Sequence, residues 1–250
     1  MSKVTLFDEV KRSWTITLND MRVYYLRPPS LMFGILFPLA LFFSFSVGRG
    51  MPVERLIPVL SAQTVFWASS SIGPASIPME RRMRTFERFL SAPISLSSVL
   101  WGKAMGGMIF GVFVTLLSAS FGIIITGQSL FNLGAFISGI ILSSLVFSSL
   151  GILFASIPTE SPGEIMMPFN LVRIPLMFVS GMFIPLSELP DIAIYAALFS
   201  PLTHTLDLFR LGMGEFSYFG WQINIMLLFV WSIVFLIIGR YFHIIQMKKT

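Results

Sequence analysis

Long apolar stretches alternate with short polar ones along most of this chain. The apolar stretches cover roughly residues 31–47, 56–78, 104–126, 133–157, 165–184 and 221–238. Several approach the ~20 residues that an α-helix needs to cross the hydrocarbon core of a bilayer, whereas a transmembrane barrel would show ~10-residue segments of alternating polarity. The pattern predicts an all-α, polytopic membrane protein that forms one domain over residues 1–250, with six transmembrane helices.

The chain begins differently, with apolar residues spaced every three or four positions. They are Val4, Phe7, Val10, Trp14, Leu18, Met21 and Tyr25. This spacing predicts an amphipathic helix on the membrane surface, which ends at Arg27 because two prolines follow it. An ordinary soluble helix is the alternative, but no soluble domain comes after it. We take residues 1–29 as this interface segment, with Trp14, Arg22, Tyr25 and Arg27 as its candidate residues.

Residues 185–220 hold two apolar stretches of half length, 189–199 and 202–211. A helix of about ten residues rises only ~15 Å, which is half of the hydrocarbon thickness. Two such helices between full spans predict a re-entrant pair, which enters the membrane and returns on the same side. A loop with two surface helices is the alternative. The candidate residues of this outer turn are Pro201, His204, Asp207 and Arg210.

Composition and charge support a membrane location. The chain is 55% hydrophobic and only 12% charged, with a mean hydropathy of +0.82, whereas soluble domains are about 25% charged. The absence of cysteine excludes disulfides and thiolate chemistry. Most of the 17 basic residues lie before residue 29, between 79 and 103, or after 238. By the positive-inside rule we expect a multi-pass protein of the plasma (inner) membrane with both termini in the cytoplasm.

The sequence offers no arrangement typical of an enzyme. Neither Ser138–Gly139 nor Ser180–Gly181 has the first glycine of a Gly-x-Ser-Gly turn, and no His/Asp/Glu cluster has the spacing of metal ligands. Gly102–Lys103 lacks the upstream glycine of a phosphate-binding loop and is followed by Ala104. We therefore expect no catalytic residue, no metal and no cofactor on this chain.

Residues 79–103 form a charged segment between two apolar ones. On a helix, one face would carry charge and the other would be apolar: Glu80, Arg81, Arg84, Glu87 and Arg88 against Met83, Phe86 and Phe89. Glu80 and Arg84 stand four positions apart, an attractive spacing. The pattern indicates a docking helix that presents fixed charge to a cytosolic partner. A basic loop on anionic lipid headgroups is the alternative.

A family resemblance is visible in residues 80–94, which read E-R-R-M-R-T-F-E-R-F-L-S-A-P-I and are followed by Gly102–Lys103. They resemble the stretch E-R-E-x-G-T-L-E-x-L-L-x-T-P-[IV]…G-K of type-2 ABC exporter permeases of the drug/polysaccharide-export type. Four further segments resemble motifs of that family and occur in the same order: Arg27–Pro28, residues 178–186, Leu189–Pro190, and residues 200–204 with Asp207 and Arg210. The resemblance covers nearly the whole chain. It departs from the family at Arg84, where glycine is usual, at Arg82, where an acid is common, and at Phe86, where leucine is usual.

The resemblance implies a permease subunit of an ABC exporter. Two permeases, identical or different, would pair with two separate ATPase subunits, which would hold ATP and Mg and drive an amphiphilic drug, lipid or glycan out of the cytoplasm. The segment 79–103 would receive the motion of the ATPase, and the re-entrant pair would lie near the exit. The residues implied in coupling are Glu80, Arg81, Arg84, Thr85, Phe86, Glu87, Arg88 and Pro93.

Arg173 lies within the predicted fifth span, where a charge is costly. One interpretation is a polar lining or gate of the pathway, together with Ser180, Gly181 and Pro185. The other is that the side chain reaches back to the membrane surface, or that the span starts later.

Two functions of other classes remain as alternatives. An ion-driven secondary transporter would place acids at mid-membrane in broken helices, and none occurs within the predicted spans. A membrane scaffold that transports nothing is the other.

Overall fold

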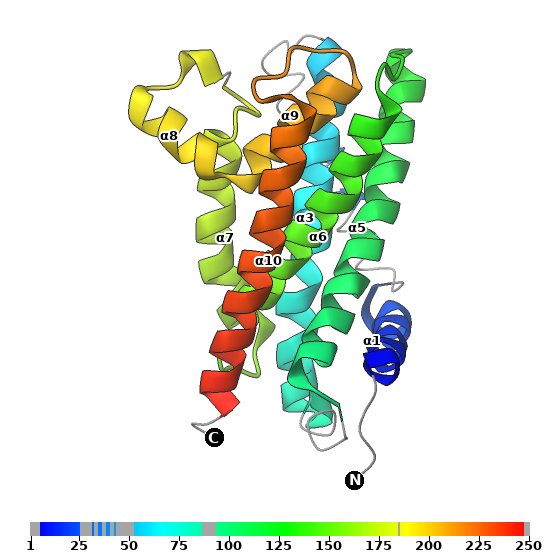
Figure 1. The fold of residues 1–250 in the computed structure, drawn as a ribbon, viewed down its shortest axis with the longest axis vertical. Coiled ribbons are helices and arrows are strands. Elements are labelled where there is room, and N and C mark those ends of the chain that lie inside the picture. The colour runs from blue at the N-terminus through cyan, green and yellow to red at the C-terminus, as the bar shows by residue number, and fades with distance from the viewer. Residues whose placement is uncertain are drawn as a thin grey trace.

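The computed structural model describes residues 6–25, 53–86, 94–184 and 186–247, and a few positions between 32 and 43. Most of these residues are helical, and they include no strand (Figure 1). The all-α prediction is therefore confirmed for this part of the chain. The predicted first span, 31–47, lies mostly outside it.

Five long helices run along the long axis of the molecule (Figure 1). They are α3 (Val53–Arg82), α5 (Leu96–Thr126), α6 (Leu133–Phe154), α7 (Pro162–Val179) and α10 (Gly220–Met247). By length and apolar composition, α5, α6 and α10 qualify as membrane spans among the described residues, and a bent pair of helices over residues 191–212 would be a fourth. Six spans are thus not established by the helices alone.

The middle of α3 packs closely against α5 and α6 through small residues. A Cβ atom on Gly111 of α5 would lie 1.8 Å from Ser69 Oγ of α3, and one on Gly107 would lie 2.1 Å from Ser148 Oγ of α6. On α6, a Cβ atom on Gly151 would lie 2.5 Å from the carbonyl oxygen of Ser70. Gly107, Gly111 and Gly151 thus allow the three helices to approach closely, as small residues do in membrane proteins.

Helix α3 contains three prolines, Pro58, Pro74 and Pro78. Each lacks the N–H group that would bond to the carbonyl four residues earlier. For Pro74 that carbonyl belongs to Ser70, the residue that Gly151 approaches.

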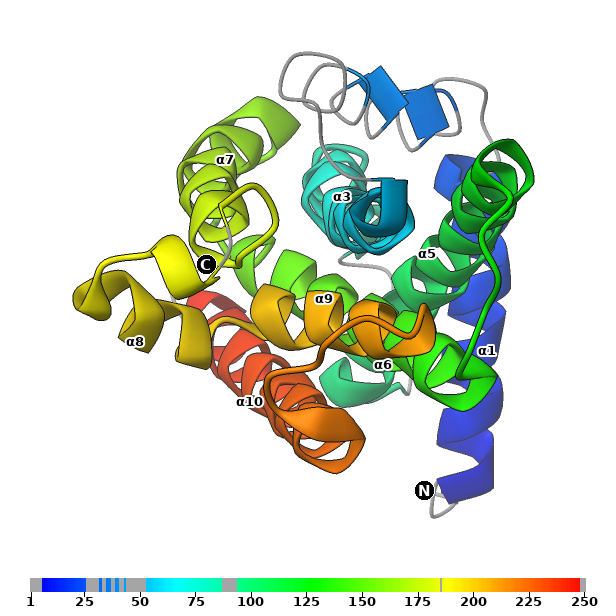
Figure 2. The same cartoon turned by 90° about the horizontal axis from the view of Figure 1, so that it is seen from above.

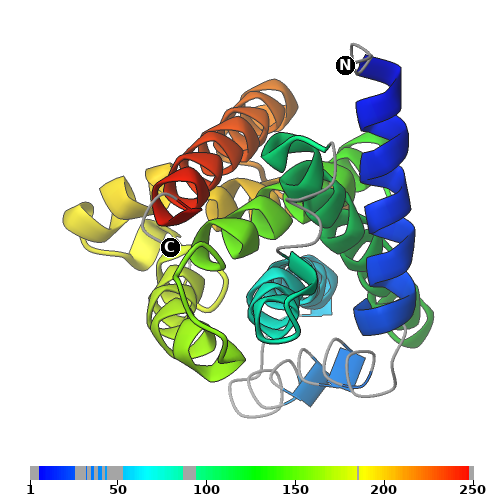
Figure 3. The same ribbon diagram turned by 90° about the horizontal axis from the view of Figure 1, so that it is seen from below.

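Helix α1 (Leu6–Asp20) crosses the lower end of α5 and continues as a short π-helix, η1 (Met21–Tyr25) (Figures 1 and 3). The predicted helix is confirmed. Trp14 is exposed, as are Val10 and Leu18, so these three residues of the predicted apolar face lie on the protein surface. Tyr25 differs, because it is buried with its ring 5.2 Å from that of Phe110.

The predicted half-length helices are present as α8 (Asp191–Phe199) and α9 (Pro201–Gly212), after a short 3-10 helix, η2 (Leu186–Glu188). They meet at an angle of 83°. Helix α9 is almost wholly buried across the ends of α6 and α10 that lie at the top of Figure 1, while α8 projects from the bundle (Figures 1 and 2). Whether the pair enters the membrane stays a prediction.

Candidate functional site

The charged segment is not the single helix that its sequence pattern predicts. Helix α3 continues to Arg82, Met83 and Arg84 form a turn, and helical backbone resumes at Thr85. Arg84 has a φ of 55°, a left-handed conformation that interrupts a right-handed helix. We call residues 80–86 the charged turn. The predicted coupling residues Glu87, Arg88 and Pro93 lie outside the described residues.

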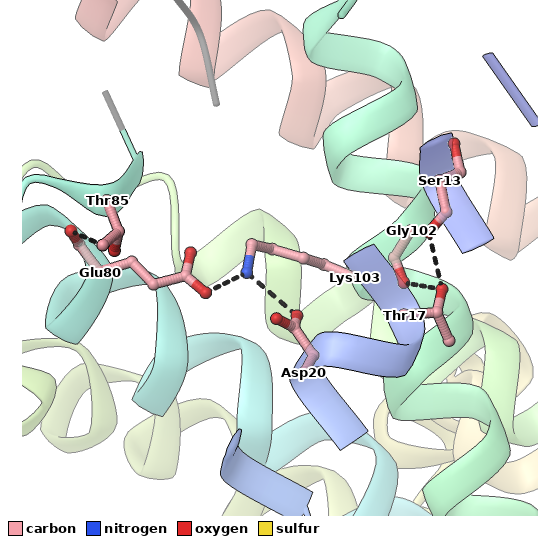
Figure 4. A network of polar contacts seen from close by, with 7 residues as sticks. All are labelled: Ser13, Thr17, Asp20, Glu80, Thr85, Gly102 and Lys103. Atoms are coloured by element: carbon pink, nitrogen blue, oxygen red, sulfur yellow. Dashed lines mark hydrogen bonds and ion pairs between the residues drawn. The ribbon is translucent and has the colours of Figure 1, made fainter. Parts of the chain in front are cut away.

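Glu80 does not lie on an exposed face, so that prediction is wrong. Its side chain is buried, and its Oε1 accepts a hydrogen bond of 2.7 Å from Lys103 Nζ. The same ammonium group donates to Asp20 Oδ2 at 3.1 Å. Figure 4 shows the three side chains converging from α3, α5 and α1. The predicted pair between Glu80 and Arg84 is replaced because a buried carboxylate requires a buried counter-charge, which Lys103 supplies.

Hydrogen bonds to the α5 backbone hold α1 beside this cluster. Ser13 Oγ donates to the carbonyl of Ser98 at 2.9 Å, and Thr17 Oγ1 donates to that of Gly102 at 2.8 Å. A Cβ atom on Gly102 would lie 2.6 Å from the carbonyl oxygen of Ser13, so glycine is needed there. On the other side, Thr85 Oγ1 donates to the carbonyl of Glu80 at 3.2 Å (Figure 4).

The cluster holds two carboxyl groups and one ammonium group. Burial raises the pKa of Asp20, and the charge of Lys103 opposes that rise. Asp20 Oδ1 and Glu80 Oε2 have no hydrogen-bond partner among the described residues. Lys103 is therefore the group on which both carboxyls depend.

Phe86 anchors the charged turn through apolar contacts. It is buried in a cluster with Ile16 of α1, Ile77 of α3 and Val99 of α5. Its ring centroid lies 6.3 Å from that of His243 on α10. The predicted apolar role of Phe86 is confirmed, and the turn is thereby connected to four helices.

Arg81 adds a polar anchor, while the tip of the turn stays open. Arg81 Nη1 donates to the carbonyl of Ile157 at 2.5 Å, and its guanidinium lies 5.6 Å from the centre of the Phe86 ring. Arg82, Met83 and Arg84 are exposed. Beside them, Arg82 and residues 159–162 and 164 line an open notch of about 380 Å³. The exposed basic surface of the turn is thus smaller than predicted, and it adjoins Glu160 and Glu164.

Arg173 is buried between helices, so its side chain is turned inward and does not reach out over the protein surface. Whether the membrane-spanning part of α7 starts after this residue stays open. Arg173 Nη2 donates to Ser70 Oγ on α3 at 2.7 Å. Its guanidinium lies 3.8 Å from the Phe169 ring centre and 4.9 Å from that of Trp67. Arg173 therefore joins α7 to α3, and a role beside a transport pathway stays a prediction.

Two other predicted gate residues lie just after α7. The hydroxyl of Ser180 donates to the carbonyl of Met177 at 2.8 Å. Gly181 has a φ of 80°, and its carbonyl accepts a 2.9 Å bond from Arg210 Nη2. The predicted gate residue Pro185 lies outside the described residues.

The predicted residues of the outer turn share α9, of which Pro201 is the first residue. Asp207 accepts hydrogen bonds from Asn224 Nδ2 at 2.7 Å and from the Ser217 hydroxyl at 2.7 Å. The two ring nitrogens of His204 lie 2.9 Å from Asn224 Oδ1 and 2.9 Å from the carbonyl of Leu198. These contacts fix α9 to α8 and to the start of α10.

A comparison with known protein families identifies the chain. Residues 11–214 match the model of the family described as ABC-2 type transporter. The chain belongs to this family. It is therefore a membrane-embedded subunit of a transporter, and its resemblance to type-2 ABC permeases is confirmed.

Curated relatives of this ABC-2 permease carry the name Nodulation protein J. The protein from Rhizobium leguminosarum bv. trifolii is 27% identical over 198 residues, 72% of this chain and 72% of its own length. That from Sinorhizobium fredii strain NGR234 is 25% identical over 224 residues, 85% of this chain and 81% of its own. That from Rhizobium meliloti strain 1021 is 25% identical over 195 residues, 72% of each.

Two residues central to this permease's charged turn, Asp20 and Lys103, were absent from the predicted site. A signal for Asp20 exists, because Ser13, Ile16, Thr17 and Asp20 form a second stripe at helical spacing, and this stripe packs on α5. Lys103 was assigned to the cytoplasmic surface with the other basic residues. Within the described residues, no group of three or more His, Asp or Glu side chains is placed to hold a metal.

Proposed function

We propose that this ABC-2 permease is the membrane subunit of an ATP-driven exporter, and that its charged turn receives the motion of a separate ATPase subunit. The observation that carries the proposal is the contrast within the turn. Phe86 and Glu80 are buried and tied to neighbouring helices, while Arg82 and Arg84 project from them. A partner can bind the exposed tip of the turn, while the buried contacts hold its base in place. Both conditions are needed for the turn to transmit force to the helices.

The remaining parts of the proposal follow from the family and the charge pattern. The permease pairs with a second copy or a related permease, and ATP and Mg belong to the ATPase. The span at 31–47 together with α3 and α7 completes six crossings of the plasma (inner) membrane. The ends of α1 and α10 lie with the charged turn at one end of the molecule (Figure 1), which we assign to the cytoplasm because basic residues concentrate there.

The proposed cargo is an amphiphilic drug, lipid or glycan, exported between the two permeases. This class fits a subunit whose described outer surface is rich in exposed apolar side chains, such as Leu171 on α7 and Ile192 on α8. Any lipid-facing helix exposes such side chains, so the cargo class rests mainly on the family resemblance.

The test is co-expression with a cognate ATPase, followed by co-purification and ATP-driven efflux from vesicles. Replacing Arg82 and Arg84 together by Glu reverses the exposed charge without adding a glycine or proline. We expect at least a tenfold loss of both complex formation and efflux, because like charges then face the ATPase surface that bound arginine. Arg240→Glu is the matched control, since Arg240 is also exposed near the cytoplasmic end.

Wild-type complex formation and efflux in the Arg82→Glu/Arg84→Glu variant would refute the docking role. Efflux that follows a proton or sodium gradient without any ATPase would favour a secondary transporter. A purified complex that hydrolyses ATP but moves no amphiphile would favour a scaffold.

A further inference from the structure

The Asp20–Lys103–Glu80 cluster connects three parts of the chain that are far apart in sequence. Asp20 ends α1, Glu80 lies in the last turn of α3, and Lys103 lies near the start of α5. The ammonium lies 3.1 Å from one carboxylate and 2.7 Å from the other, and each of the three side chains is at most 3% exposed. A contact so well shielded is little weakened by salt.

Lys103 connects α1 with α3. The hydrogen bonds of the neighbouring hydroxyl groups do not make this connection. Ser13 and Thr17 bond from α1 to the α5 backbone. Thr85 bonds within the charged turn. The ammonium of Lys103 bonds on one side to α1 and on the other to the base of the charged turn. A lysine carries three donors on one nitrogen, so a single side chain serves both partners.

Stability alone is a weak reason for such a cluster. Removing three ionisable groups from water costs more than burying apolar side chains of similar size, and buried ion pairs are often replaceable by them. What the charged cluster adds is direction, because both carboxylates must point to one nitrogen. The apolar contacts of Phe86 keep the turn in the core but do not fix its orientation relative to α1, since apolar contacts are not directional.

We propose that Lys103 is a positioning residue that joins α1 and the charged turn into one rigid unit, so that a push on the turn moves α1 and the lower end of α5 together. The transport role of this unit rests on the proposed function. Its rigidity does not, and can be measured on the permease alone.

The first experiment measures the distance between α1 and the turn in purified permease. The chain has no cysteine, so Lys11→Cys and Met83→Cys, both at exposed positions, accept two spin labels without competing sites. We expect one narrow distance distribution, which Lys103→Met widens at least twofold. Lys103→Arg should restore it, because a guanidinium can also bond both carboxylates. Ser143→Ala, which removes a bond to Thr205 on α9, is the control and should leave it narrow.

If Lys103→Met fails to fold, the neutral triple variant Asp20→Asn/Glu80→Gln/Lys103→Met replaces it, since it leaves no unpaired buried charge. The same widening is expected. A distribution as narrow as that of the wild type in either variant would overturn the proposal.

The second experiment measures efflux per ATP hydrolysed in the complex with the ATPase. Lys103→Met should assemble and hydrolyse ATP while this ratio falls at least tenfold, and Lys103→Arg should recover most of it. A purely stabilising residue would lower protein yield and leave the ratio unchanged, which would overturn the coupling role. If the wild-type permease binds no ATPase, the proposed function fails. The spin-label distances still decide whether Lys103 holds α1 and the charged turn together.

Discussion

At the scale of single residues, the buried Asp20 makes the stability of the folded protein depend on pH. Burial raises its pKa above the ordinary value of 3.8, so the folded protein holds this proton more tightly than the unfolded chain. Stability that depends on a bound proton is complete at pH values below the unfolded pKa and is lost as pH rises through the folded pKa.

We therefore expect the Tm of the wild type to fall relative to that of Asp20→Asn as pH increases from about 4 through the folded pKa of Asp20, and then to run parallel. Thermal unfolding of detergent-solubilised protein between pH 4 and 8 measures this. Asp191→Asn, at an exposed aspartate of α8, serves as the control and should follow the wild type. Parallel curves for Asp20→Asn and the wild type over the whole range would contradict the assignment.

Phe86 is the residue on which the base of the charged turn rests. Phe86→Ala should lower the free energy of unfolding by about 3–5 kcal/mol, because it leaves a cavity among residues of several helices. Met83→Ala, three residues earlier and exposed, should change it by less than about 0.5 kcal/mol. Chemical or thermal unfolding of the two purified variants compares them, and equal small effects would show that Phe86 is not an anchor.

Arg84 stands where the resembled family has glycine, and its backbone conformation shows why glycine suits this position. The family resemblance expects glycine there, and the structure gives this residue a φ of 55°, the left-handed region that glycine adopts without a Cβ penalty. The sequence therefore held the information that the helix breaks at this position. The helical spacing of the charges on either side favours a continuous helix and so conceals the break.

At the scale of elements, close approach of α3 and α6 is the feature most sensitive to substitution. Gly151→Ala would place a Cβ atom 2.5 Å from a backbone carbonyl, which cannot move aside, and should destabilise the protein by about 1–3 kcal/mol. Gly111→Ala should cost less, because the Ser69 hydroxyl that it meets can rotate.

Gly163→Ala is the matched control, since only Ser161 Oγ at 3.8 Å lies near its added Cβ. Thermal unfolding should rank the three variants in the order Gly151→Ala, Gly111→Ala, Gly163→Ala, from least to most stable. A Gly151→Ala variant as stable as the wild type would mean that α3 and α6 are not in contact there.

Element boundaries were predictable where polar breaks are sharp. The predicted ranges 133–157, 189–199 and 202–211 agree with α6, α8 and α9 to within about three residues. Asn132 caps the start of α6, and Ser200 lies between α8 and α9. The predicted fifth span runs to 184, whereas α7 ends at Val179. Apolar residues continue past that end, but Gly181 with its φ of 80° turns the chain away.

For the whole molecule, the most consequential prediction is which end of the helix bundle faces the cytoplasm. Single cysteines at Met83 and Phe216, both exposed and at opposite ends of the bundle, should react differently with a membrane-impermeant maleimide. We expect Phe216→Cys to be labelled in intact cells, and Met83→Cys only after the membrane is opened. The cysteine-free wild type gives the background. Labelling of Met83→Cys in intact cells would place the charged turn outside and exclude an ATPase as its partner.

Local patterns reveal helices and charge bias, but not which distant side chains meet. Lys103 and Asp20 are 83 positions apart, and Arg173 and Ser70 are 103 apart. No periodicity connects such pairs, since the contact depends on how α1, α3, α5 and α7 pack. The charged turn could therefore be located from sequence, whereas its anchors required the structure.

The prolines of α3 have a mechanical consequence for this molecule. Pro74 and Pro78 leave two carbonyls of the helix without backbone donors, so the lower part of α3 bends at less energetic expense than uninterrupted α5 or α6. Arg173 of α7 donates a hydrogen bond to Ser70 of α3, one of the residues whose carbonyl is left without a backbone donor. A change in the bend of α3 at this place would therefore also move α7.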